Sequence, residues 1–168
     1  AAADVCAIEG KDEERTERLS TSSPEIDAVL GGGLTVGSVS LLTGEPGIGK
    51  STLLLQLGAG VAAGAAKVLY VSGEESVPQV RARAERLGVH APGFFLLAET
   101  DVDRILATTS VERPHLLLVN SIQTLFSGRA PGAPGGVTQV REIAARLVRL
   151  AKSTGVSVIV VGHVTKDG

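Results

Sequence analysis

The sequence predicts an α/β fold in which helices flank a doubly wound, mainly parallel β-sheet. A glycine-rich segment, residues 44–51, lies between a strand-like apolar segment and a helix-like segment. Five short apolar segments alternate with helical patterns, as strands and crossover helices do in a parallel sheet. Only 2% of the residues are aromatic, so valine, leucine, isoleucine and alanine must form the core, as they do in sheets that helices cover on both faces.

The composition indicates one globular domain. The chain has 168 residues, of which 43% are hydrophobic, enough for a sizeable core. A net charge of −2 excludes a protein that is basic overall, so any contact with nucleic acid requires a local patch. Cys6 is the only cysteine, which excludes an internal disulfide and a four-cysteine zinc site. No apolar run approaches the ~20 residues of a membrane span, so we expect no contact with a membrane. The sequence contains no methionine, and we expect it to be a fragment of a longer protein.

The first elements lead to the glycine-rich segment. Residues 1–18 form a mixed lead-in, and we expect it to be flexible because the run at residues 11–18 is charged and has no apolar face. A short helix is predicted over residues 24–30, because Pro24 suits a first helical position and three glycines follow. Residues 39–43 predict a buried strand, and a helix is predicted to begin at Ser51.

The later elements alternate regularly. Strands are predicted at residues 68–72, 94–98, 116–120 and 156–161. Helices are predicted at residues 76–87, 101–110 (with Thr100 as the cap) and 138–154. Residues 127–136 are rich in glycine, proline and alanine and predict an exposed loop. Ligands of such sheets bind at the carboxyl ends of the strands, so the residues that follow the strands should lie at the same edge as the glycine-rich segment.

Residues 44–51 match the pattern G-x-x-x-x-G-K-[ST] at every fixed position. The glycines let backbone N–H groups point at phosphate oxygens, and the following helix adds the partial positive charge of its N-terminus. Lys50 would reach the β- and γ-phosphates of a nucleotide, and the Ser51 hydroxyl would hold Mg²⁺. The predicted nucleotide-binding residues are Gly44, Glu45, Pro46, Gly47, Ile48, Gly49, Lys50, Ser51 and Thr52.

Further motifs follow in an order typical of one family. We call residues 44–51 the phosphate loop. The segment LGGGL at residues 30–34 precedes this loop, and YVSGEES at 70–76, SIQTL at 121–125 and GHVTK at 162–166 come after it. With these motifs the chain resembles the RecA-like P-loop ATPases, and among them the bacterial RadA (Sms) family of DNA-repair and recombination ATPases. The resemblance covers residues 19–168, roughly the whole chain after the lead-in.

The resemblance implies a DNA-dependent ATPase that binds ATP or ADP with Mg²⁺. Such a protein acts on single-stranded or branched DNA in the bacterial cytoplasm, promotes branch migration in recombination, forms a homo-hexamer and can have a recombinase as a partner. Loops near residues 127–137 and after residue 165 would contact the DNA. Members of the family also carry an N-terminal zinc motif, a Lys-Asn-Arg-Phe-Gly motif and a C-terminal Lon-like domain. None of these occurs in the 168 residues, so we expect residues 19–168 to be a truncated ATPase core that binds no zinc.

The resemblance also assigns catalytic residues. Glu74 resembles the glutamate that polarises the attacking water, Glu75 is the second candidate, and His163 resembles the residue that senses the γ-phosphate. An acidic helix start and an ordinary histidine at a strand end are the alternatives. Where the family has the Walker B aspartate that positions Mg²⁺, this chain has Asn120. An amide keeps one acceptor oxygen but loses the charge, so we expect weak Mg²⁺ binding and slow hydrolysis.

Two other functions fit parts of the pattern. KaiC-like regulatory ATPases share the Gly-Gly-Gly-Leu segment and the pair of glutamates. A nucleotide-binding module that has lost hydrolysis would fit Asn120. The sequence therefore leaves a DNA motor, a regulatory ATPase and a binding module to be distinguished.

Overall fold

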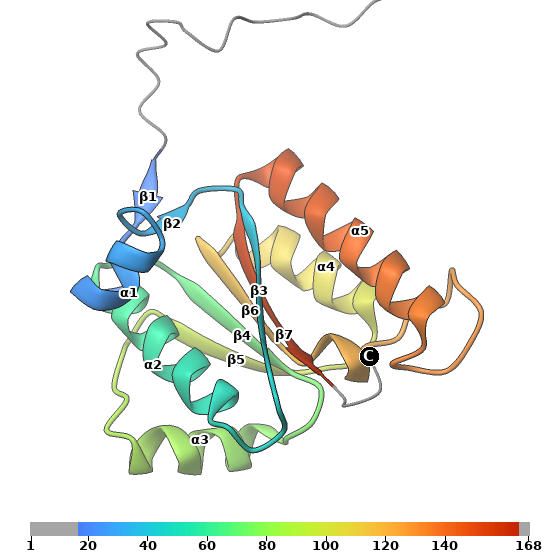
Figure 1. Ribbon diagram of the computed structural model, residues 1–168, viewed down its shortest axis with the longest axis horizontal. Helices are drawn as coiled ribbons and strands as arrows, with labels where there is room; N and C mark the ends of the chain where they lie inside the picture. The colour runs from blue at the N-terminus through green and yellow to red at the C-terminus, as the bar shows by residue number, and fades with distance from the viewer. Residues whose placement is uncertain (1–16, 165–168) are drawn as a thin grey trace, which may run out of the picture.

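The structure is a computed structural model that describes residues 17–164. Residues 1–16 of the expected lead-in and the DNA-contacting segment expected after residue 165 lie outside the described residues. A five-stranded parallel sheet forms the centre of the fold, in the order β3-β7-β6-β4-β5 (Figure 1). Its strands are β3 (Val39–Gly44), β4 (Val68–Ser72), β5 (Phe94–Ala98), β6 (Leu116–Asn120) and β7 (Ser157–His163). The predicted parallel, helix-flanked sheet is confirmed.

Five α-helices and one short 3₁₀ helix accompany the sheet in the described residues. They are α1 (Pro24–Val29), α2 (Lys50–Ala63), α3 (Val77–Arg86), α4 (Val102–Glu112), η1 (Ile122–Thr124) and α5 (Val137–Thr154). Two short strands, β1 (Arg18–Leu19) and β2 (Leu34–Thr35), pair as a separate antiparallel sheet. Within residues 17–164, none of the helices combines the length and apolar character that crossing a membrane requires.

The order of the strands explains why helices cover both faces of the sheet. The chain moves across the sheet from β3 through β4 to β5, and then returns through β6 to β7. Because crossover connections between parallel strands are right-handed, reversing the direction of travel moves the helices to the opposite face. Figure 1 shows α2 and α3 on one side of the sheet and α4 and α5 on the other.

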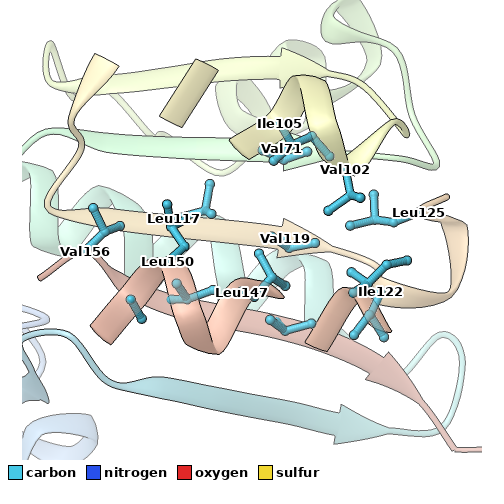
Figure 2. Close-up of a cluster of buried hydrophobic side chains, with 14 of the residues drawn as sticks. Val71, Val102, Ile105, Leu117, Val119, Ile122, Leu125, Leu147, Leu150 and Val156 are labelled. Carbon is cyan, nitrogen blue, oxygen red and sulfur yellow. The ribbon is translucent and has the colours of Figure 1, made fainter. Parts of the chain in front are cut away.

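Alternate side chains of the strands enter two separate cores. On β6, Leu117 and Val119 face α4 and α5, whereas Leu116 and Leu118 pack with residues of α2. Figure 2 shows the first of these cores, where Leu147 and Leu150 of α5 lie against the sheet. The apolar run of β6 therefore has side chains on both faces of the sheet, and each face is covered by helices. This is the arrangement that a continuous apolar strand sequence predicts.

The strand predicted at residues 39–43 is confirmed as β3, but the prediction that it is buried is wrong. β3 is an edge strand of the described sheet and pairs only with β7, so its residues alternate between exposed and partly exposed. Leu41 is 66% exposed. The local sequence is as apolar as that of a central strand, but the position of a strand in the sheet depends on contacts between distant segments. The exposure of β3 therefore could not be read from its composition.

Several element boundaries differ from the predictions by one or two residues. At two of them, side-chain hydrogen bonds show the difference. The cap of α4 is Asp101, not Thr100: the Asp101 carboxylate accepts a hydrogen bond from the backbone N–H of Asp103 at 2.8 Å. Arg18, expected in the flexible lead-in, belongs to β1, and its guanidinium donates to the carbonyl oxygens of Leu30 and Gly33, both at 3.0 Å. The lead-in boundary predicted at residue 18 is therefore at least one residue too late.

Candidate functional site

The carboxyl ends of four strands meet at one edge of the sheet. Gly44 of β3 lies opposite His163 of β7, and Ser72 of β4 lies opposite Asn120 of β6. Glu74 follows β4 by two residues. The structure thus brings the phosphate loop and the three polar residues predicted at this edge into one region, although Asn120 and His163 end their strands and do not follow them.

The phosphate loop connects β3 to α2. Gly47 and Gly49 have φ angles of 81° and 107°, which side chains rarely permit, so both positions depend on glycine. Gly49 caps α2 without a side-chain hydrogen bond. The first backbone N–H groups of a helix have no partner inside the helix, so this uncapped terminus can receive an anion. Ile48 points outward and is 71% exposed.

Lys50 occupies the inside of the loop. Its side chain is buried, and its ammonium group donates to the carbonyl oxygens of Gly44 and Glu45, both at 2.7 Å. The positive charge is therefore already held where the motif requires it to meet phosphate oxygens.

A cavity of about 410 Å³ opens beside the loop, within the range of small-ligand sites. Most of the loop lines it, together with both glutamates and His163. Sequence reasoning missed two arginines of α3 that also line it, Arg83 and Arg86, whose spacing of three places them on one helix face. The lining residues are Pro46, Gly47, Gly49, Lys50, Ser51, Thr52, Glu74, Glu75, Arg83, Arg86 and His163.

Glu74 carries two hydrogen bonds on one carboxylate oxygen. The Ser121 hydroxyl donates to Oε1 at 2.7 Å, and Nε2 of His163 lies 2.9 Å from the same oxygen. Burial alone raises the pKa of Glu74, but the bonds from His163 and Ser121 and the charges of His163 and Lys50 outweigh it, so the pKa lies below its ordinary value. The carboxylate is therefore ionised and oriented at neutral pH.

Glu75 has a different environment. Its carboxylate forms an ion pair with Arg83 at 2.8 Å, and both side chains are mostly buried. The ion pair involves Oε1 of Glu75, and the two contacts of Glu74 likewise involve only its Oε1, so each carboxylate has a second oxygen outside these contacts. The two glutamates therefore differ in their partners: Glu74 contacts Ser121 and His163, whereas Glu75 is paired with the cation Arg83.

Asn120 lies behind the loop and is fully buried. Its Nδ2 donates to Ser51 Oγ at 2.9 Å and to the Tyr70 hydroxyl at 3.0 Å. Burial raises the pKa of Tyr70 to about 12, so the phenol stays neutral. The amide oxygen of Asn120 is buried and has no hydrogen-bond partner.

These residues fit a magnesium ion that the nucleotide itself mainly holds. Residues 17–164 contain no cluster of three or more His, Cys, Asp or Glu side chains that could bind a metal alone. The Ser51 hydroxyl oxygen and the Asn120 amide oxygen are both hard oxygen atoms, which can bind Mg²⁺ or accept a hydrogen bond from its bound water. Phosphate oxygens would have to supply the remaining negative charge.

The loop predicted to contact DNA is anchored at its base. Gln139 of α5 is fully buried and makes hydrogen bonds with the backbone N–H of Ser127 at 2.8 Å and the carbonyl oxygen of Ala130 at 2.7 Å. Ser127 is itself fully buried, so the prediction of an exposed loop fails at its first residue. Arg129 is exposed, and its guanidinium nitrogen Nη2 lies 3.7 Å from Oδ1 of Asp103.

Comparisons with known proteins place the chain in a family. Residues 8–168 match the family described as AAA domain. The chain is 50% identical over 155 residues to the DNA repair protein RadA of Halalkalibacterium halodurans, covering 92% of this chain and 34% of that protein. It is 45% identical over 164 residues to the RadA protein of Bacillus subtilis, covering 98% of this chain and 35% of that protein. The resemblance to the RadA family is confirmed, and the chain spans about a third of the length of these relatives.

A solved structure shows the same fold. The flagellar accessory protein FlaH from Methanocaldococcus jannaschii superposes with a TM-score of 0.67, covering 91% of this chain and 74% of that one, at 16% identity. At this identity the likeness concerns the fold alone. Together with the family match, it confirms the predicted RecA-like P-loop fold.

Proposed function

The chain belongs to the AAA domain family, and on this premise we propose that it is the ATP-hydrolysing core of a DNA-dependent, RecA-like motor. The motor would act in DNA repair and homologous recombination in the bacterial cytoplasm. One observation carries the proposal: Lys50, Ser51 and Glu74 line a single cavity at the carboxyl edge of the sheet. Phosphoryl transfer to water needs held phosphates, an oriented water and neutralised charge, and these side chains can supply all three.

Each residue has a separate role in this proposal. Lys50 and the N–H groups of the loop bind the β- and γ-phosphates. Ser51, with Asn120 behind it, would hold Mg²⁺, which neutralises phosphate charge when bound. Glu74 accepts a hydrogen bond from the attacking water and orients it toward the phosphorus. His163, which lies beside both Glu74 and the cavity, responds to the γ-phosphate.

The similarity to RadA proteins supports the assignment to DNA repair. Branch migration, a homo-hexameric assembly, a recombinase partner and binding of single-stranded or branched DNA are parts of the proposal that extend to the longer protein. Residues 127–137 are the described part of the proposed DNA contact, and the anchored loop base with exposed Arg129 suits a contact with the phosphate backbone.

A second function is favoured by one contact. Asn120 donates to Ser51, the hydroxyl that should hold Mg²⁺, and lacks the charge of an aspartate. A module that binds nucleotide but does not hydrolyse it would have this feature. A KaiC-like regulatory ATPase is the third possibility, and it would hydrolyse ATP without a response to DNA.

Single-turnover ATP hydrolysis, with and without single-stranded DNA, distinguishes these functions. We expect slow hydrolysis by the chain, faster hydrolysis by Asn120→Asp, and none by Glu74→Gln. Glu85→Gln, a change at an exposed glutamate of α3, is the matched control. Nucleotide binding without hydrolysis in both the chain and Asn120→Asp would favour the binding module. Hydrolysis that DNA does not change would favour the regulatory ATPase.

A further inference from the structure

We propose that Ser121 is a positioning residue for Glu74, holding one carboxylate oxygen so that the other faces the attacking water. The inference rests on the proposed function, because it takes Glu74 to be the residue that orients this water. The sequence motifs assign no role to Ser121, although this residue directly follows Asn120.

The geometry of the carboxylate supports this role. Ser121 Oγ donates to Oε1 of Glu74 at 2.7 Å, and the side chain of Ser121 is fully buried. His163 Nε2 lies 2.9 Å from the same oxygen. With both bonds on Oε1, Oε2 remains to accept a hydrogen bond from water, and rotation of the carboxylate would break both contacts.

Ser121 is itself held rigidly. The hydroxyl and the backbone N–H of Thr124 donate to the Ser121 carbonyl oxygen at 2.8 and 3.2 Å. The backbone N–H of Gly73 donates to the Asn120 carbonyl oxygen at 2.9 Å, which ties the end of β4 to the end of β6. A Cβ atom on Gly73 would lie 2.0 Å from the Thr124 hydroxyl, so only glycine permits this approach. The serine and the glutamate are therefore presented to each other by two fixed segments.

The two side chains that donate to Oε1 of Glu74, those of Ser121 and His163, differ in their exposure to the cavity. His163 lies at the strand end, is partly exposed and lines the cavity, so a bound γ-phosphate can compete for its Nε2. Ser121 is buried and does not line the cavity. Against the effect of burial, Lys50 lowers the pKa of Glu74 through its charge. The other charged side chains that line the cavity with Glu74 are Glu75, Arg83 and Arg86. When His163 turns to the nucleotide, the bond from Ser121 remains to orient the carboxylate.

The test compares Ser121→Ala with Ser157→Ala. Ser157 is an equally buried serine at the amino end of β7, and its hydroxyl donates to the Thr35 carbonyl oxygen at 3.1 Å, away from the site. Misplacing a catalytic group by about 1 Å can cost roughly 100-fold in rate. We expect Ser121→Ala, in the Asn120→Asp background, to slow single-turnover hydrolysis roughly 10- to 100-fold at saturating ATP while ATP affinity is unchanged. Ser157→Ala should change neither quantity.

Carbon-13 NMR of labelled glutamate provides a readout that a purely structural role would not move. The Glu74 carboxyl signal, assigned from its loss in Glu74→Gln, should titrate at higher pH in Ser121→Ala, because the hydrogen bond that stabilises the ionised form is gone. Thr124→Val, which removes the hydroxyl holding the Ser121 carbonyl, should shift it in the same direction by less. If Ser121→Ala does not fold, the titration of Glu74 in Thr124→Val tests the role of Ser121 in its place.

The outcomes separate this inference from the proposed function. An unchanged Glu74 titration and an unchanged hydrolysis rate in Ser121→Ala would overturn the role of Ser121. A parallel loss of ATP affinity would also overturn it, because it would show general damage to the site. Normal hydrolysis by Glu74→Gln would instead refute the proposed role of Glu74, whatever Ser121→Ala does.

Discussion

Asn120 Nδ2 donates a hydrogen bond to Ser51 Oγ over 2.9 Å, linking the end of β6 to the first turn of α2. The hydroxyl that the phosphate-loop motif assigns to Mg²⁺ is therefore an acceptor for the amide, and its own proton must point elsewhere. An aspartate at this position would reverse the bond, since a carboxylate only accepts. The direction of this hydrogen bond is therefore the feature that an aspartate at position 120 would change.

Restoring the carboxylate should strengthen the dependence of nucleotide binding on Mg²⁺. In Asn120→Asp, the carboxylate accepts from Ser51 and Tyr70 and adds a negative charge beside the water shell of the metal. Titration of Mg²⁺ at fixed ADP, followed with a fluorescent nucleotide, should show a lower midpoint than in the unaltered chain. Identical midpoints would place Asn120 outside the metal site.

Lys50→Ala should weaken ATP binding roughly 10- to 100-fold, because a charge-assisted hydrogen bond contributes about 1.5–3 kcal/mol. Calorimetry measures the affinity directly. Lys152→Ala, at an exposed position in the last turn of α5, serves as the control and should bind normally. Equal affinities in the two variants would contradict the assignment of the phosphate loop.

Gln139→Ala should destabilise the fold by about 1–3 kcal/mol, the cost of leaving buried polar groups unpaired. The variant removes the partners of Ser127 and Ala130 at the base of the loop. Urea unfolding measures the free energy, and Gln56→Ala, at an exposed position of α2, should change it little. Amide exchange should also accelerate within residues 127–136, and an unchanged exchange rate there would show that Gln139 does not anchor the loop.

The ion pair between Asp103 and Arg146 should make stability depend on pH. The hydrogen bond from buried Arg146 holds the pKa of Asp103 below its ordinary value, with smaller charge effects from Arg146 and Arg129. A carboxyl with a lowered pKa in the folded state stabilises the protein above its unfolded-state pKa, and this stabilisation is lost as the pH falls. Asp103→Asn should therefore be less stable than the unaltered chain at neutral pH, and the difference should shrink in acid. A difference that stays constant with pH, measured by urea unfolding, would exclude this contribution.

The sequence by itself determined the fold class, the phosphate loop, and nearly all the strands of the sheet and the helices that flank it. These features depend on short-range patterns, such as the glycines of residues 44–51 and the apolar runs of β4, β5 and β6. They could be predicted because each pattern favours one local backbone conformation, and here the packing of the fold agrees with that preference.

Only the tertiary structure decided which strand lies at the edge and which side chains meet. β3 is exposed because β7 is its only neighbour in the described sheet, although its sequence is that of a buried strand. Ser121 reaches Glu74 from 47 residues away, and Glu75 is turned to Arg83. Such pairs form when packed layers bring distant segments together, and hydrogen bonds of this kind leave no periodic signal in the chain. The residue types available for chemistry were thus visible in the sequence, whereas packing decided which of these side chains contact one another.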